Sequence, residues 1–171
     1  INQFPEKIVS DLNLIKFGYE QNSKSMKNIG LDIHGNHVVV SQDEISGVED
    51  KDAKQFKHYE SSLKKFAKAI EPFWMKKMPA IGGNTISEIL TFAQIGLKLK
   101  LLGKKDMREL LRVASLPARD LMDENFDSDL LKATLCWDAL IGSTQAPRSP
   151  NNSILTLLYR MAGIHHGHYT L

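Results

Sequence analysis

The chain has 171 residues, of which 42% are hydrophobic and 25% are charged, and its formal net charge is +2. This balance is ordinary for a globular protein with a buried core, and so small a positive charge argues against a nucleic-acid-binding surface. The single cysteine, Cys136, excludes an internal disulfide and a cysteine-based metal cluster. The sequence also has no run of 18 apolar residues, so it predicts no membrane-spanning helix.

The first 48 residues predict a short helix followed by antiparallel strands. Pro5 and Glu6 fit the first turn of a helix over 4–13. Apolar and polar residues alternate over 14–19, which predicts a strand, and two further strands are predicted over 26–33 and 37–41. Gly35 and Asn36 tolerate positive φ and fit the turn between the last two strands. The acidic segment 42–52 predicts a loop or the start of a helix.

Residues 49–171 predict a helical region. The first long helix, over 52–73, has aromatic and aliphatic residues every three or four positions and should end or kink at Pro72. Ser115 is the predicted cap of the short helix that runs to Glu124. Further helices are predicted over 85–102, 104–114, 115–124, 128–142 and 150–163. The predicted fold class is therefore α+β, mostly α, with strands over 1–48 and helices over 49–171.

The helix over 85–102 is apolar on most sides and has four lysines near its C-terminal end, Lys98, Lys100, Lys104 and Lys105. One interpretation is an interfacial helix, in which lysines meet anionic head groups at a membrane surface. The favoured interpretation is a central helix that is buried on nearly all sides. The helix over 104–114 should turn four residues inward, namely Met107, Leu110, Leu111 and Ala114.

The helix over 128–142 carries the most specific pattern of the chain. Asp127 or Ser128 can cap its first turn, and Gly142 can end it in the left-handed conformation. Prolines then hold the connection out of helix. The next helix is expected to place five apolar residues inside, namely Ile154, Leu155, Leu157, Leu158 and Met161.

A resemblance to known proteins is carried by the segment Leu131–Gly142, the pairs Ala146-Pro147 and Ser149-Pro150, and the segment Leu157–Gly163. They resemble the phytoene-desaturase-like FAD-dependent oxidoreductases, in the branch called pyridine nucleotide-disulphide oxidoreductase-domain proteins. Weaker resemblance extends back to Phe4–Leu12 and Tyr59–Leu63. The resemblance implies that this helix, loop and helix form the substrate side of a flavoenzyme. It also implies that the N-terminal strands join a larger antiparallel sheet.

The resemblance implies FAD as the cofactor and hydride transfer between FAD and a hydrophobic small-molecule substrate. However, the chain contains no Gly-x-Gly-x-x-Gly fingerprint, which dinucleotide binding of this kind requires. We therefore expect a segment of a longer flavoprotein, inactive alone, whose partner is the rest of that protein. It should be intracellular, either cytoplasmic or membrane-associated. Open sheet edges and cavity walls further predict self-association.

The resemblance and the apolar stripe together predict seven substrate-cavity residues, while no catalytic residue is identifiable. They are Thr134, Trp137, Asp138, Ile141, Leu155, Leu158 and Tyr159. Asp138 could be an acid or base, but the favoured interpretation is an ion pair with Arg148 or Arg160, because a lone buried charge is costly. Arg148 is also a weak candidate for contacting the cofactor. Cys136 is interpreted as a core residue rather than a reactive thiol.

Two further points concern metal binding and an alternative function. His165, His166 and His168 could bind a metal, but neighbouring residues rarely converge on one ion, so a solvated loop is favoured and no metal site is predicted. The alternative to a flavoenzyme segment is a self-contained helical module without enzymatic activity. Such a module would bind a partner or a membrane surface through the helix over 85–102.

Overall fold

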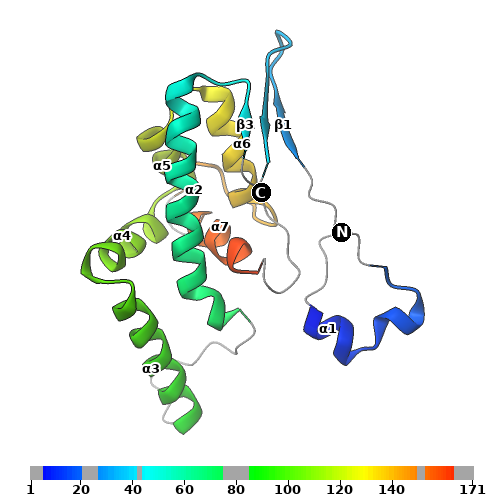
Figure 1. Cartoon of the computed structure of the whole chain (residues 1–171), viewed down its shortest axis with the longest axis vertical. Coiled ribbons are helices and arrows are strands. Elements are labelled where there is room, and N and C mark those ends of the chain that lie inside the picture. The colour runs from blue at the N-terminus through cyan, green and yellow to red at the C-terminus, as the bar shows by residue number, and fades with distance from the viewer. Residues whose placement is uncertain (1–5, 21–26, 42–43, 75–84, 150–152, 164–171) are drawn as a thin grey trace.

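The computed structural model describes residues 6–20, 27–41, 44–74, 85–149 and 153–163. The fold is α+β and mostly helical, as predicted. Figure 1 shows the long helix α2 (Asp50–Ile70) running along the body, with the β-hairpin beside one end and helix α3 (Ile86–Leu101) extending beyond the other. After α2 the chain continues as a short 3-10 helix, η2 (Glu71–Phe73), which contains Pro72. Pro72 therefore ends the α-helix, as predicted.

The described strands form one antiparallel sheet in the order β1-β2-β3. Strand β1 (Asn28–Leu31) pairs with β2 (His37–Val40), with Ile29 opposite Val39. The connecting turn places Gly35 at φ 87°, as predicted, and the Asp32 carboxylate accepts hydrogen bonds from the amides of His34 and Asn36. Strand β3 (Ile45–Ser46) lies where a loop or helix start was expected. Its two residues are too short for an alternation pattern to be visible in the sequence.

The predicted strand over 14–19 is wrong. After helix α1 (Glu6–Asp11), residues Leu14–Phe17 form a 3-10 helix, η1. Asn13 and Gly18 flank it, both in the left-handed conformation, which tightens the chain into a local turn. Ile15 and Phe17 are exposed by 73% and 79%. Alternation alone does not make a strand when no neighbouring strand supplies hydrogen bonds.

The hydrophobic core joins α2 to the helices that follow α3. These are α4 (Lys104–Ser115), α5 (Ala118–Asn125), α6 (Asp129–Leu140) and α7 (Ser153–Ala162). Helix α7 packs against α2, α4 and α6, while α6 also packs against β1 and β2. Val38 and Val40 of β2 lie in the same core as Leu131 of α6 and Leu158 of α7. The sheet and the helices thus share one core.

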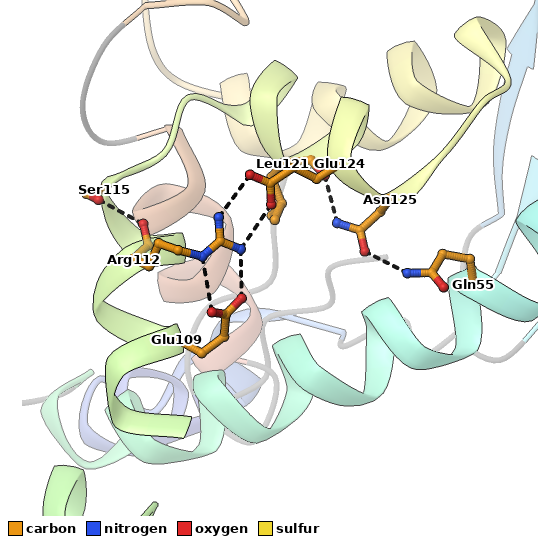
Figure 2. A network of polar contacts seen from close by, with 7 residues as sticks. All are labelled: Gln55, Glu109, Arg112, Ser115, Leu121, Glu124 and Asn125. Carbon is orange, nitrogen blue, oxygen red and sulfur yellow. Dashed lines mark hydrogen bonds and ion pairs between the residues drawn. The ribbon is translucent and has the colours of Figure 1, made fainter. Parts of the chain in front are cut away.

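A polar network fixes α4 and α5 to each other and to α2 (Figure 2). The Arg112 guanidinium of α4 donates to both carboxylate oxygens of Glu124 in α5, each at 2.9 Å, and also pairs with Glu109. Asn125 accepts a hydrogen bond from Gln55 of α2 at 3.0 Å. The two-pronged Arg112–Glu124 contact has the geometry that gives carboxylate pairs their specificity.

Three predictions about helix faces and caps are wrong. Leu111 was expected inside but is 57% exposed, because the buried face of α4 runs through Leu110 and Val113. Leu155 was expected inside but is 43% exposed. Ser115 does not cap α5, since its hydroxyl donates to the carbonyl of Arg112 and Pro117 occupies the N-cap position.

Helix α3 also corrects an expectation. It was expected to be a central helix buried on nearly all sides, yet none of its residues is buried in the described part of the chain. Ile95 and Leu99 are half-buried on the side facing the body. Its other side exposes Ile86, Leu90 and Leu97 by 57–78%. The apolar composition of α3 therefore reflects an exposed apolar surface and not a second buried core.

Candidate functional site

Contacts at the start of α6 hold this helix against α2. The Ser128 side chain accepts a hydrogen bond from the amide of Leu131 at 3.3 Å, which confirms it as the N-cap. The buried carboxylate of Asp52 accepts hydrogen bonds from the amides of Asp127, at 3.0 Å, and Ser128, at 2.9 Å. Asp127 in turn pairs with Lys51. Gly142, at φ 79°, follows the end of α6 in the left-handed conformation, as predicted.

A cavity lies among α2, β2, α6 and α7. Its walls are mostly apolar, and it is lined by Val40, Phe56, Tyr59, Glu60, Leu63, Leu135, Asp138, Leu157 and Met161. The volume is about 30 Å³, enough for a few water molecules. Small-molecule sites usually occupy several hundred Å³. The described cavity therefore holds at most the end of a larger molecule.

Asp138 is the only one of the seven predicted substrate-cavity residues in this lining. It is 4% exposed and forms an ion pair with Arg160 of α7, which confirms the favoured interpretation. Both Nη2 and Nε of Arg160 donate to the same oxygen, Oδ1, at 2.7 and 2.9 Å. Burial raises the pKa of Asp138, and Arg160 opposes this shift. The second oxygen, Oδ2, is buried without a hydrogen-bond partner.

Thr134 lies one turn before Asp138, against Gly30 of the sheet. Its hydroxyl donates to the carbonyl of Leu130 at 2.7 Å. A Cβ atom on Gly30 of β1 would lie 1.9 Å from the Thr134 hydroxyl oxygen, far inside van der Waals contact. Gly30 therefore permits the close approach of β1 to α6. The role of Thr134 seen here is packing.

The other predicted residues divide between core and surface. Leu158 is fully buried and Ile141 is half-buried. Trp137 is 64% exposed, and Leu155 and Tyr159 are also exposed. The Tyr159 ring stacks on Trp74, with centroids 4.0 Å apart. Arg148 is exposed in the loop between α6 and α7. None of these side chains lines the cavity found in the described part of the chain, and their contact with a substrate stays a prediction.

Two buried groups have strongly raised pKa values. Burial raises the pKa of the Cys136 thiol to about 11, which supports its interpretation as an unreactive core residue. Burial also raises the pKa of the Tyr59 hydroxyl well above its usual range. Tyr59 packs edge-on against Phe126, with ring centroids 5.2 Å apart. Both groups remain protonated at neutral pH and contribute packing.

The sequence did not single out the residues of α2 that line the cavity as site residues. Phe56, Tyr59 and Leu63 belong to the apolar face predicted for α2, and Glu60 lies on the same helix. The spacing of that face was the available signal. This spacing does not indicate which later helix packs on the apolar face of α2, so it does not predict the position of the cavity.

The described ranges contain no group of three or more His, Cys, Asp or Glu side chains arranged to hold a metal ion. His165, His166 and His168 lie outside these ranges. Among the described helices, none has the length and apolar character needed to cross a bilayer.

Comparison with known proteins shows weak similarity over most of the chain. A mouse protein named pyridine nucleotide-disulfide oxidoreductase domain-containing protein 2 is 28% identical over 138 residues, which is 76% of this chain and 23% of that protein. Its rat counterpart is 28% identical over 137 residues, with the same shares covered. The similarity is to an oxidoreductase family. The chain spans about a quarter of the length of these curated relatives. No protein-family model and no solved structure matches it.

Proposed function

We propose that this chain is the apolar, substrate-side part of an FAD-dependent oxidoreductase of the phytoene-desaturase-like type. The observation that carries this proposal is the similarity to two proteins named as oxidoreductases over 76% of the chain. Bound FAD would accept or return a hydride, while this chain would supply an apolar surface that positions the substrate and excludes water. The substrate is a hydrophobic small molecule.

Two structural features support the proposal that this chain packs against other parts of a longer protein. Ile29 and Leu31 of the edge strand β1 are 59% and 72% exposed, although apolar strand residues usually face a core. The small sheet is also antiparallel, and a strand from another part of a longer chain can pair with its edge. A flavin site built by other parts of a longer protein would agree with the absence of a dinucleotide fingerprint from this sequence.

Flavin content tests the proposal directly. The complete protein that contains this sequence should show flavin absorbance and fluorescence after purification, whereas the 171-residue chain should show neither. The coding sequence beside the chain should also encode a Gly-x-Gly-x-x-Gly motif. A complete protein without flavin and without that motif would refute the proposal.

The exposed apolar face of α3 favours a second function, a surface that binds a membrane. Leu90 and Leu97 are each 57% exposed, and Lys98 and Lys100 lie in the last turn of the helix. An apolar face with flanking lysines suits the surface of an anionic bilayer. The chain should sediment with vesicles containing phosphatidylserine, and Leu90→Glu/Leu97→Glu should abolish this. Equal sedimentation of both proteins would exclude α3 as the binding face.

A further inference from the structure

The unpaired oxygen of Asp138 is the starting point of a binding-site proposal. Among the described residues, Asp138 Oδ2 is the only buried side-chain oxygen or nitrogen without a hydrogen-bond partner. A buried polar atom without a partner is costly, so such atoms commonly mark a position where a water or a ligand supplies the missing hydrogen bond. An ionised carboxylate oxygen accepts hydrogen bonds but donates none. The missing partner is therefore a donor.

The cavity beside Asp138 limits what this donor can be. Its lining is aliphatic and aromatic except for Asp138, Glu60 and the Tyr59 hydroxyl. Glu60 lies one helical turn from Lys64 and pairs with it at 3.0 Å. The cavity is partly open, and its volume of about 30 Å³ accommodates only a few non-hydrogen atoms. A small polar end group attached to an apolar chain fits this arrangement.

The charge balance favours a neutral donor. Arg160 already pairs with Asp138, with its side chain only 15% exposed, so the pair has no net charge. Bringing an ammonium group into the same apolar site would require desolvation of a further positive charge, and the already paired carboxylate compensates that cost poorly. A hydroxyl group needs no such compensation. It can donate to Oδ2 while its carbon chain contacts the apolar walls.

We propose that the cavity between α2, α6 and α7 binds the hydroxyl end of an apolar alcohol, with Asp138 Oδ2 accepting its hydrogen bond and Arg160 holding the carboxylate in place. If this alcohol is the substrate, the substrate of the proposed oxidoreductase is a hydrophobic alcohol. That assignment rests on the proposed function. Binding itself involves only groups within this chain. It can therefore be measured in the absence of flavin.

Three probes of similar size separate the candidate donors. Binding of 1-hexanol, pentyl methyl ether and hexylamine to the full chain would be followed by NMR chemical shifts and titration calorimetry. The ether has as many non-hydrogen atoms as the alcohol but no hydroxyl donor. We expect 1-hexanol to bind about tenfold more tightly than the ether, the effect of one hydrogen bond to a charged group. It should also bind more tightly than hexylamine.

Paired variants then assign the preference to Asp138. Asp138→Leu/Arg160→Met replaces both charges with apolar groups and should fold, since it leaves neither charge unpaired. It should bind the alcohol and the ether equally. Leu111→Ala, at an exposed position of α4, should keep the tenfold preference.

Several outcomes would overturn the proposal. These are equal binding of alcohol and ether by the unaltered chain, tighter binding of hexylamine, a preference retained in the double variant, and no binding of any probe. Failure of the flavin test with a confirmed alcohol preference would leave the binding site standing and remove only its assignment to an oxidoreductase substrate. Confirmed flavin content without an alcohol preference would refute the binding site alone and leave the proposed oxidoreductase function standing.

Discussion

Arg160 donates two hydrogen bonds to a single oxygen of Asp138 and leaves the other carboxylate oxygen unpaired. The pair joins α6 to α7 beside the cavity, where the Asp138 side chain is only 5% exposed. A buried pair of this kind is sensitive to the loss of one partner, because the remaining charge then lies in an apolar environment without compensation. The stability of the α6–α7 contact should therefore depend on both residues together.

Removing one member of this pair should cost more than removing both. We expect Asp138→Leu and Arg160→Met each to lower the free energy of unfolding by about 3 kcal/mol. The double variant should recover most of this loss, because it buries no lone charge. Urea denaturation of the four proteins gives the coupling free energy as a double-mutant cycle. Additive losses in the double variant would show that the two charges do not interact.

Stability should depend on the protonation of Asp138. Its pKa is raised by burial above the usual 3.8, so the folded chain holds this proton more tightly than the unfolded chain. The resulting contribution to the free energy of unfolding is fully present below about pH 4 and decreases as the pH rises through the folded pKa. Asp138→Asn does not titrate there. The stability of the variant relative to the unaltered chain should therefore increase from about pH 4 to pH 7.

Urea denaturation at several pH values measures this difference. Subtracting the stability of the unaltered chain from that of the variant cancels the contributions of the other carboxylates. One of these is Glu109, whose pKa is lowered mainly by its hydrogen bond with Arg112. A relative stability of Asp138→Asn that falls with rising pH would mean that Arg160 outweighs burial and that the pKa of Asp138 is lowered.

Gly30→Ala should disrupt the contact between the sheet and α6. The added methyl group would lie 1.9 Å from the Thr134 hydroxyl oxygen, so either the Thr134 side chain or the spacing between β1 and α6 must change. We expect a loss of about 1–3 kcal/mol in the free energy of unfolding. Gly30→Ala/Thr134→Ala should recover part of it. Thermal or urea unfolding measures both.

The matched control is Gly96→Ala in α3, where an added Cβ meets no atom within 4 Å. Because alanine favours helix more than glycine does, this variant should be more stable by up to about 1 kcal/mol. Equal effects of the two substitutions would argue against a close approach of β1 to α6.

Asp52→Ala should weaken the attachment of α6 to α2. The substitution leaves the amides of Asp127 and Ser128 without their acceptor. We expect a loss of about 2–3 kcal/mol, since both hydrogen bonds involve a buried carboxylate. Asp50→Ala, at an exposed position in the first turn of the same helix, controls for the loss of an acidic residue near the helix N-terminus. Hydrogen exchange of the Leu131 amide should quicken in Asp52→Ala and not in Asp50→Ala.

Local sequence rules were enough to predict the elements whose residues repeat over several turns or carry their own ends. The apolar face of α2, the Ser128 cap and the left-handed Gly142 all follow from local rules, because helix period and capping involve residues close in the chain. The partner of Asp138 was also predictable as an arginine, since an unpaired buried charge is so costly. The α+β, mostly α class followed from the same local patterns.

Which apolar faces are covered depends on the tertiary packing. The composition of α3 suggested a buried helix, and its outer face is exposed because no described element packs on it. Alternation over 14–19 suggested a strand, but a strand needs hydrogen bonds from a neighbour and the segment forms η1 instead. The cavity beside Asp138 likewise required α2, β2, α6 and α7 to meet. Burial and strand pairing depend on residues that are distant in the chain, and a local sequence pattern does not show which distant residues come together.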